Sequence, residues 1–291
     1  MNTPLSAVNL KLAINNLDSL PAMPVIAQKL LGLDLDSVAG ERDLLKLIEQ
    51  DPQISAKIIG LSNSALFGAS KRVTSVQDAA ILLGLTRVKS VTLGIALMTA
   101  LIKKPSGQLD MQALWLHSLS VSLALRTLAQ AMPRHTRPLD DEIFLAGLLH
   151  DIGFLVLNHL DQTRSDELHS RFAADSSRPI EALEAEMLEL NHAELGAELA
   201  RYWDLPDAIV AMIRYHHTPE LETADIGQPL VSMVNLAEKM LTEYGLPNHE
   251  TPVVSDDEWL ALGIAPSRAK ELWEKINEQV VAAKAAGISF S

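Results

Sequence analysis

Apolar residues recur at helical spacing along almost the whole chain. Positions three and four apart are apolar through residues 53–67, 109–132 and 230–245, and no stretch shows the strict alternation of a half-buried strand. The hydrophobic content is 48% with only 4% aromatics, so the core is expected to be aliphatic. We therefore predict an all-α protein, folded as a two-lobed helical bundle.

The most apolar stretch is residues 143–160, IFLAGLLHDIGFLVLNHL, and it carries His150 and Asp151 side by side in its middle. The pattern predicts a single helix that is buried nearly all round. A buried carboxylate is costly unless it meets a cation or several hydrogen-bond donors. Neutral imidazole beside carboxylate suits a divalent metal ion. The alternative is a core histidine bonded to a carbonyl beside an aspartate bonded to backbone amides, and the dipeptide alone does not decide between the two.

Turn and capping residues predict the other helix boundaries in the first half. We expect helices over 25–33, 43–50 and 53–67, with Pro52 near the start of the last. Ser75 is expected to cap a helix that ends at Gly84, and Thr86 to cap the next, which runs to about residue 102. The linker-like run 103–107, KKPSG, predicts a lobe boundary. The expected organisation is a first lobe over 1–104, a second over 105–245 and a helical extension over 246–291.

In the second half, helices are expected over 109–132, 179–189 and 230–245, with another that begins after Asn191 as its cap and one that begins at Pro206. The acidic run from Glu181 to Glu189 is expected to form a solvated helix face.

Charge and composition exclude several functional classes. Lys and Arg number 24 and Asp and Glu 37, a net charge of −13, which disfavours nucleic acid and anionic membranes as partners. There is no cysteine, so disulfides and thiolate chemistry are excluded. No signal peptide is evident, and the longest apolar run, 91–102, is too short to span a bilayer. A cytoplasmic protein is expected.

Histidines gather in the helices of the predicted second lobe. Five of the nine lie in these helices or at their ends, and two carboxylates add to them. The seven candidate ligands are His117, His150, Asp151, His192, His216, His217 and Glu238. They come from five separate segments, as a metal site inside a helical bundle requires. The alternative is that these histidines are satisfied core residues. The other four histidines (His135, His159, His169, His249) fall in loops or polar segments and are assigned to solvent.

Three runs in the first half carry a family resemblance. LPAMPVIAQKLL (20–31), DPQISAKIIGLSNSALFG (51–68) and TSVQDAAILLGLTRVKSV (74–91) are similar to the signature of the HDOD domain, a regulatory offshoot of the HD superfamily of metal-dependent phosphohydrolases. The order H…HD…H…HH…acid resembles that superfamily, most closely its HD-GYP branch. The resemblance covers about residues 17–245. It implies that the seven candidates hold one or two ions of iron, manganese, zinc or nickel, with Glu238 where the family usually has aspartate.

Two departures weaken the enzymatic implication. The HD-GYP pattern continues HDxGK, whereas this chain reads HDIGF, so Phe154 replaces a phosphate-gripping lysine; the GYP loop is also absent. The resemblance therefore implies a signalling adaptor that acts through protein partners, with homo-oligomerisation left open. The alternative is a phosphodiesterase acting on a nucleotide or cyclic dinucleotide. In that case His117, His150, Asp151 and Glu238 would hold one metal, and the other three histidines would hold or share a second.

Overall fold

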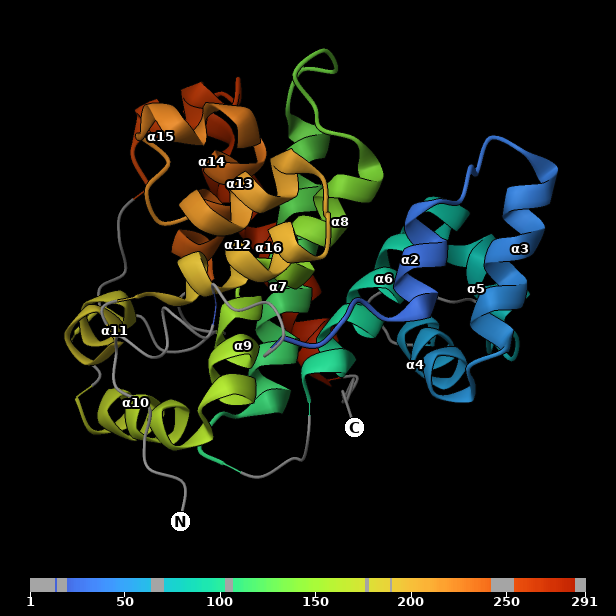
Figure 1. The fold of residues 1–291 in the computed structure, drawn as a ribbon. Helices are drawn as coiled ribbons and strands as arrows, with labels where there is room; N and C mark the ends of the chain where they lie inside the picture. The colour runs from blue at the N-terminus through green and yellow to red at the C-terminus, as the bar shows by residue number, and fades with distance from the viewer. Residues whose placement is uncertain are drawn as a thin grey trace.

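The computed structural model describes residues 14, 20–63, 71–102, 107–175, 178–188, 190–241 and 254–285. Every regular element in these ranges is a helix (Figure 1), so the all-α prediction is confirmed. The elements are α2 (Val25–Leu31), α3 (Val38–Glu49), α4 (Pro52–Ser62), α5 (Val76–Leu83), α6 (Leu85–Leu101), α7 (Met111–Ala131), α8 (Asp140–Leu149), α9 (Ile152–Leu160), α10 (Gln162–Ala174), α11 (Ile180–Leu188), α12 (His192–Tyr202), α13 (Asp207–Tyr215), η3 (Glu222–Gly227), α14 (Leu230–Met240), α15 (Asp256–Ala261), η4 (Pro266–Arg268) and α16 (Ala269–Ala285).

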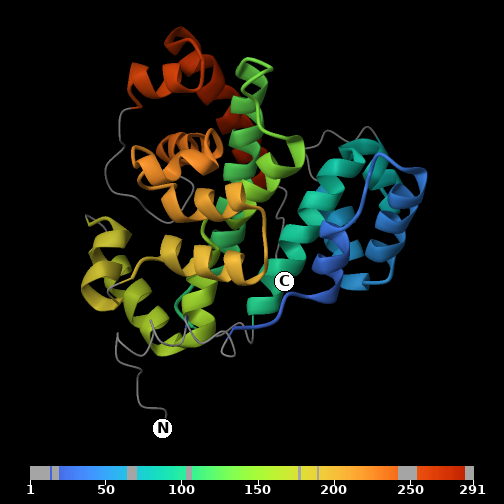
Figure 2. The same cartoon turned by 45° about the horizontal axis from the view of Figure 1, so that its top comes forward.

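Helix α6 stands between two groups of helices. It packs against α2, α4 and α5 on one side and against α8 and α9 on the other, as Figures 1 and 2 show. Its apolar residues are buried on all sides, and a Cβ at Gly94 would meet Leu148 Cδ1 at 2.5 Å. Of the predicted linker only Gly107 is among the described residues, so the lobe boundary stays a prediction.

Most predicted caps are present. The side chains of Ser75 and Asn191 accept backbone N–H groups at the starts of α5 and α12, as predicted, and Asp51, which was not predicted as a cap, does so at the start of α4. The expectation for Thr86 was wrong. Gly84, with φ 87°, ends α5 and serves directly as the N-cap of α6, so Thr86 already lies inside the helix. Helix α3 also begins earlier than predicted, because Ser37 caps it.

The predicted single helix over 143–160 is two helices. Helices α8 and α9 meet at a 42° bend, and His150 and Asp151 form the turn between them. Asp151 has φ −98° and ψ 15°, outside the helical region, so both side chains project from a helix junction. The predicted burial is confirmed, since residues 143–157 are all buried.

The predicted C-terminal extension packs against α7. Helix α16 lies against α7 (Figure 2), with Leu272, Ile276 and Val280 buried. The Thr127 hydroxyl donates to Gln279 Oε1 at 3.1 Å. Across the described ranges, no helix taken singly has the length and apolar character to cross a membrane. The bent pairs α5–α6 and α8–α9 reach that length only when joined.

Candidate metal centre

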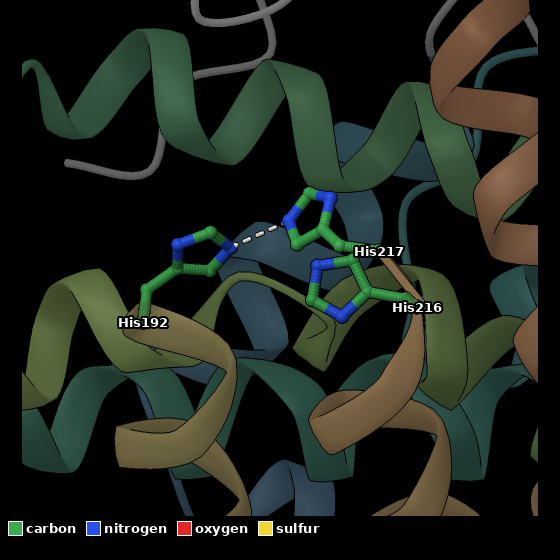
Figure 3. A group of neighbouring side chains, drawn as sticks. All are labelled: His192, His216 and His217. Atoms are coloured by element: carbon green, nitrogen blue, oxygen red, sulfur yellow. Dashed lines mark hydrogen bonds between the residues drawn. The ribbon is translucent and has the colours of Figure 1, made fainter. Parts of the chain in front are cut away.

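Five elements bring all seven predicted residues together in two adjacent groups. One group is His117 from α7, His150 and Asp151 from the α8–α9 turn, and Glu238 from α14. The other is His192 at the start of α12 with His216 and His217 at the end of α13 (Figure 3). Within each group the potential ligand atoms all lie within 4.8 Å of one another.

Asp151 faces both groups, one carboxylate oxygen to each. Its Oδ2 lies 3.3 Å from His150 Nε2 and 3.5 Å from His117 Nε2. Its Oδ1 lies 3.3 Å from His192 Nε2 and 3.9 Å from His216 Nε2. Ligands bound about 2.1 Å from one ion stand roughly 3.0–3.4 Å apart at octahedral to tetrahedral angles. Most of the spacings around Asp151 are close to this range, so Asp151 and the histidines around it could hold a divalent ion.

Backbone carbonyls at helix ends set the protonation of two histidines. His150 Nδ1 donates to the Gly147 carbonyl at 2.9 Å, and His216 Nδ1 donates to the Ile213 carbonyl at 2.8 Å. A carbonyl can only accept, so in the neutral ring each Nε2 carries a lone pair. The buried Nε2 of His216 has no hydrogen-bond partner within the described part of the chain. Such an orphaned acceptor inside a ligand cluster fits a metal ion.

Two glutamates of α11 orient the rings of the other two histidines. His192 Nδ1 lies 2.9 Å from Glu184 Oε2, and His217 Nδ1 lies 2.9 Å from Glu181 Oε1. Both rings therefore aim Nε2 inward, and these atoms are 3.0 Å apart (Figure 3). Two lone pairs at that distance repel unless a proton or a metal ion lies between them. A histidine that binds a metal through one ring nitrogen commonly donates a hydrogen bond to a carboxylate from the other.

The carboxylates of the cluster favour positive charge beside them. Burial raises the pKa of Glu238, but His217, His216 and His150 outweigh it and lower that pKa to about 2. Burial lowers the pKa of His150, yet Asp151 and Glu238 raise it to about 10. Burial and neighbouring His217 lower the pKa of His216 to about 3. The carboxylates are thus ionised and draw positive charge into the centre, which a divalent ion supplies directly.

Phe154 covers one face of the centre. Its ring stacks on His192, with centroids 4.2 Å apart and planes 20° apart, and it is fully buried. On its other side it meets His169 edge-on at 5.7 Å. The position where the HD-GYP pattern has lysine is therefore filled by an apolar ring in contact with a candidate ligand.

Three sequence-based assignments were wrong. His169 is buried in α10, where its Nδ1 lies 2.7 Å from the Ser165 carbonyl oxygen, and His159 is half-buried in α9, 3.1 Å from the Leu101 oxygen. Only His135 is exposed as expected, and His249 lies outside the described residues. The third wrong assignment is the solvated helix face expected for the acidic run: Glu186 is exposed, but Glu184 is completely buried.

Glu184 is the functional residue that the sequence analysis missed. Its Oε1 accepts the His192 backbone N–H at 2.9 Å while Oε2 bonds the ring, so one carboxylate positions the whole residue. The available signal was weak. Glu184 lies between apolar Leu183 and Leu188, and both are buried on the same helix.

Comparison with known proteins identifies the family of the chain. The HDOD domain matches residues 20–219, more than two thirds of the chain. This chain belongs to the HDOD domain family. The matched region contains every candidate ligand except Glu238, which lies beyond it on α14.

Individual relatives extend the comparison. An HDOD domain protein of unknown function from Geobacter sulfurreducens is 26% identical, with a TM-score of 0.75 over 98% of each chain. A Marinobacter aquaeolei VT8 protein, whose name places it provisionally in signal transduction, is 25% identical, with a TM-score of 0.82 over 97% of this chain and 65% of that one. An uncharacterized protein of Treponema pallidum (strain Nichols) is 26% identical over 239 residues. The match covers 81% of this chain but only 45% of that relative.

Proposed function

We propose that this HDOD protein is a regulatory module of bacterial signal transduction, which acts through contacts with protein partners and holds divalent metal in a closed centre. The metal would be structural or sensory, held by the seven candidate ligands as one or two ions of iron, manganese, zinc or nickel. The similarity to the Marinobacter protein supports the signalling role.

The closure of the centre carries this proposal. His150, His216 and His192 are fully buried, and Phe154 stacks on His192. Only the side chains of His217 and Glu238 are partly exposed, at 24% and 17%. A phosphohydrolase needs a cationic, open cleft where developing phosphoryl charge is stabilised. In this protein the apolar ring of Phe154 and buried imidazoles occupy that position.

An apolar groove on the first lobe supports the choice of a protein partner. It lies between α3 and α5, has a volume of about 670 Å³ and is lined mainly by apolar side chains. Val38 and Ile81 at this groove are 73% and 84% exposed. Exposed apolar patches rimmed by polar residues mark protein contact sites. The net charge of −13 disfavours nucleic acid or an anionic membrane there.

Site-specific cross-linking in cells tests the partner role. A photo-reactive residue at Gln77, beside the groove, should give a discrete adduct with another protein, and Ile81→Glu should abolish it. Leu139→Glu is the matched control, since Leu139 is also an exposed apolar residue (66%) but does not line the groove. An adduct of equal yield in Ile81→Glu, or no adduct with any protein, contradicts the proposal.

A metal-dependent phosphohydrolase is the second candidate, and the placement of Asp151 between two ligand groups favours it. A divalent ion lowers the pKa of a bound water so that it can act as a nucleophile at neutral pH. In that case the chain's own contribution would be to orient the imidazoles through Gly147, Ile213, Glu181 and Glu184.

Hydrolysis assays on metal-loaded protein separate the two candidates. We expect no turnover of cyclic dinucleotides or an aryl phosphodiester, and Phe154→Lys should not create any, because the GYP loop is missing as well. Metal content per chain should be one or two equivalents and should fall in His150→Ala. Turnover that disappears in His150→Ala would establish the enzyme, and turnover gained in Phe154→Lys would refute the role given to Phe154.

A further inference from the structure

A second enclosed site lies where the two groups of helices meet. The cavity has a volume of about 310 Å³, within the range of small-ligand sites. The turn from α5 to α6, the second half of α7 and the segment leading into α8 form its walls. Three arginines line it: Arg87, Arg126 and Arg137.

Among the described residues, no carboxylate forms an ion pair with the arginines of this cavity. Arg87 and Arg126 are half-buried, and neither forms a salt bridge or hydrogen bond with another described residue. Burial and the neighbouring Arg126 lower the pKa of Arg87 to about 10, against the attraction of Asp140. Asp140 is the one carboxylate among the described lining residues. Like charges gathered in a chain of net charge −13 point to an anionic ligand.

Two further features of the wall favour phosphate. Gly84 and Thr86, at the N-terminus of the 17-residue helix α6, line the cavity; that helix has no side-chain cap and no acidic residue in its first turn. Its free N–H groups and dipole favour an anion. Arg137 is held by donating from Nη2 to the carbonyls of Gln130 and Met132, while its buried Nε has no partner in the described part of the chain.

We propose that this cavity binds the phosphate group of a small phosphorylated ligand. Arginine forks match phosphate oxygens, and the start of α6 adds backbone donors. The site is separate from the metal centre: Asp140 and His150 are ten residues apart on α8, about 15 Å along the helix axis. A phosphate bound here contacts α6 of the first lobe and both α7 and α8, which carry His117 and His150.

Calorimetric titration of the 291-residue protein tests the site, with inorganic phosphate and adenosine 5′-monophosphate as probes. Arg87→Gln and Arg126→Gln should each raise Kd about tenfold or more, because each removes a charge-assisted hydrogen bond. Arg134→Gln is the matched control, since it removes a positive charge from the same loop as Arg137 but does not line the cavity. His150→Ala should bind both probes like the wild type. Tighter binding of the nucleotide than of phosphate identifies a phosphomonoester ligand, and equal binding identifies free phosphate.

The proposal is overturned if Arg87→Gln binds phosphate with the same affinity as the wild type. It is also overturned if binding is lost in His150→Ala but kept in Arg87→Gln, because that result would place the phosphate at the metal centre. Thermal denaturation shows whether each variant is folded. Without phosphate, Arg87→Gln should melt no lower than the wild type, because repulsion from Arg126 is relieved. With phosphate, the wild type, Arg134→Gln and His150→Ala should melt higher, whereas Arg87→Gln should not, and a rise of equal size in Arg87→Gln also overturns the proposal.

Discussion

At the residue scale, the centre depends on which nitrogen of each histidine carries the proton. Gly147 and Ile213 carbonyls hold the Nδ1 protons of His150 and His216, and the carboxylates of α11 hold those of His192 and His217. The inward Nε2 lone pairs follow from these outer contacts. Glu184 is the most consequential outer residue, because it bonds both the ring and the backbone of His192.

Glu184→Gln should therefore weaken metal binding about tenfold or more, since the amide loses the charge that raises the basicity of His192. Glu186→Gln on the same helix is the control, because Glu186 is exposed and pairs with Arg178 on the surface. Competition of both variants against a fluorescent chelator measures the difference. Equal affinities in the two variants would remove Glu184 from the centre.

At the element scale, the centre is assembled by close helix crossings. A Cβ on Gly153 would meet the His192 carbonyl oxygen at 1.8 Å, so the start of α9 lies directly against the start of α12. Gly196 lies at the same crossing, where a Cβ added to it would lie 3.1 Å from the Gly153 backbone N. Only glycine at 153 allows His192 to approach Asp151 this closely.

Gly153→Ala should lower the free energy of unfolding by about 2–3 kcal/mol, because backbone rather than a flexible side chain must move. Gly60→Ala, in the last turn of α4 with nothing within 4 Å of its Cβ, should instead raise it, by at most about 0.5–1 kcal/mol. Chemical denaturation measures both. A Gly153→Ala protein as stable as the wild type, with unchanged metal content, would contradict the crossing.

At the scale of the whole molecule, the ligands tie distant segments of the chain together. They come from α7, the α8–α9 turn, α12, α13 and α14, and α16 covers α7 from outside. Trp203 adds a link to the first lobe, since its indole N–H donates to the Pro21 carbonyl at 2.9 Å. Metal bound at the centre should therefore stabilise the fold as a whole.

Chelation should lower the melting temperature, because metal that binds only the native state adds about 2.7 kcal/mol at a free concentration of 100 times Kd. Protons compete for the same nitrogens, and carboxylates raise the pKa of His150 and His192. Metal stabilisation should thus shrink as the pH falls from about 8 to about 5. Scanning calorimetry with and without metal at both pH values measures the rise in melting temperature that metal produces. An equal rise at the two pH values, or no rise at either, would contradict this account.

Local patterns predicted the helices, because capping and periodicity act within a few residues. Ser75, Asn191 and Gly84 could be placed from their neighbours alone. The break at His150–Asp151 could not, since its flanks are as apolar as the rest of 143–160 and nothing local interrupts the helix. Likewise, the periodicity of α11 gave no reason to separate buried Glu184 from exposed Glu186.

By itself, the sequence determined the helical class, the family resemblance and the seven candidate ligands, because residue types and their order are local information. Tertiary structure alone decided that Asp151 lies between the two histidine groups, that Glu184 orients His192 and that Phe154 stacks on it. Each of these depends on helices far apart in the chain approaching closely. That approach is set by packing at Gly94 and Gly153, which no single segment encodes.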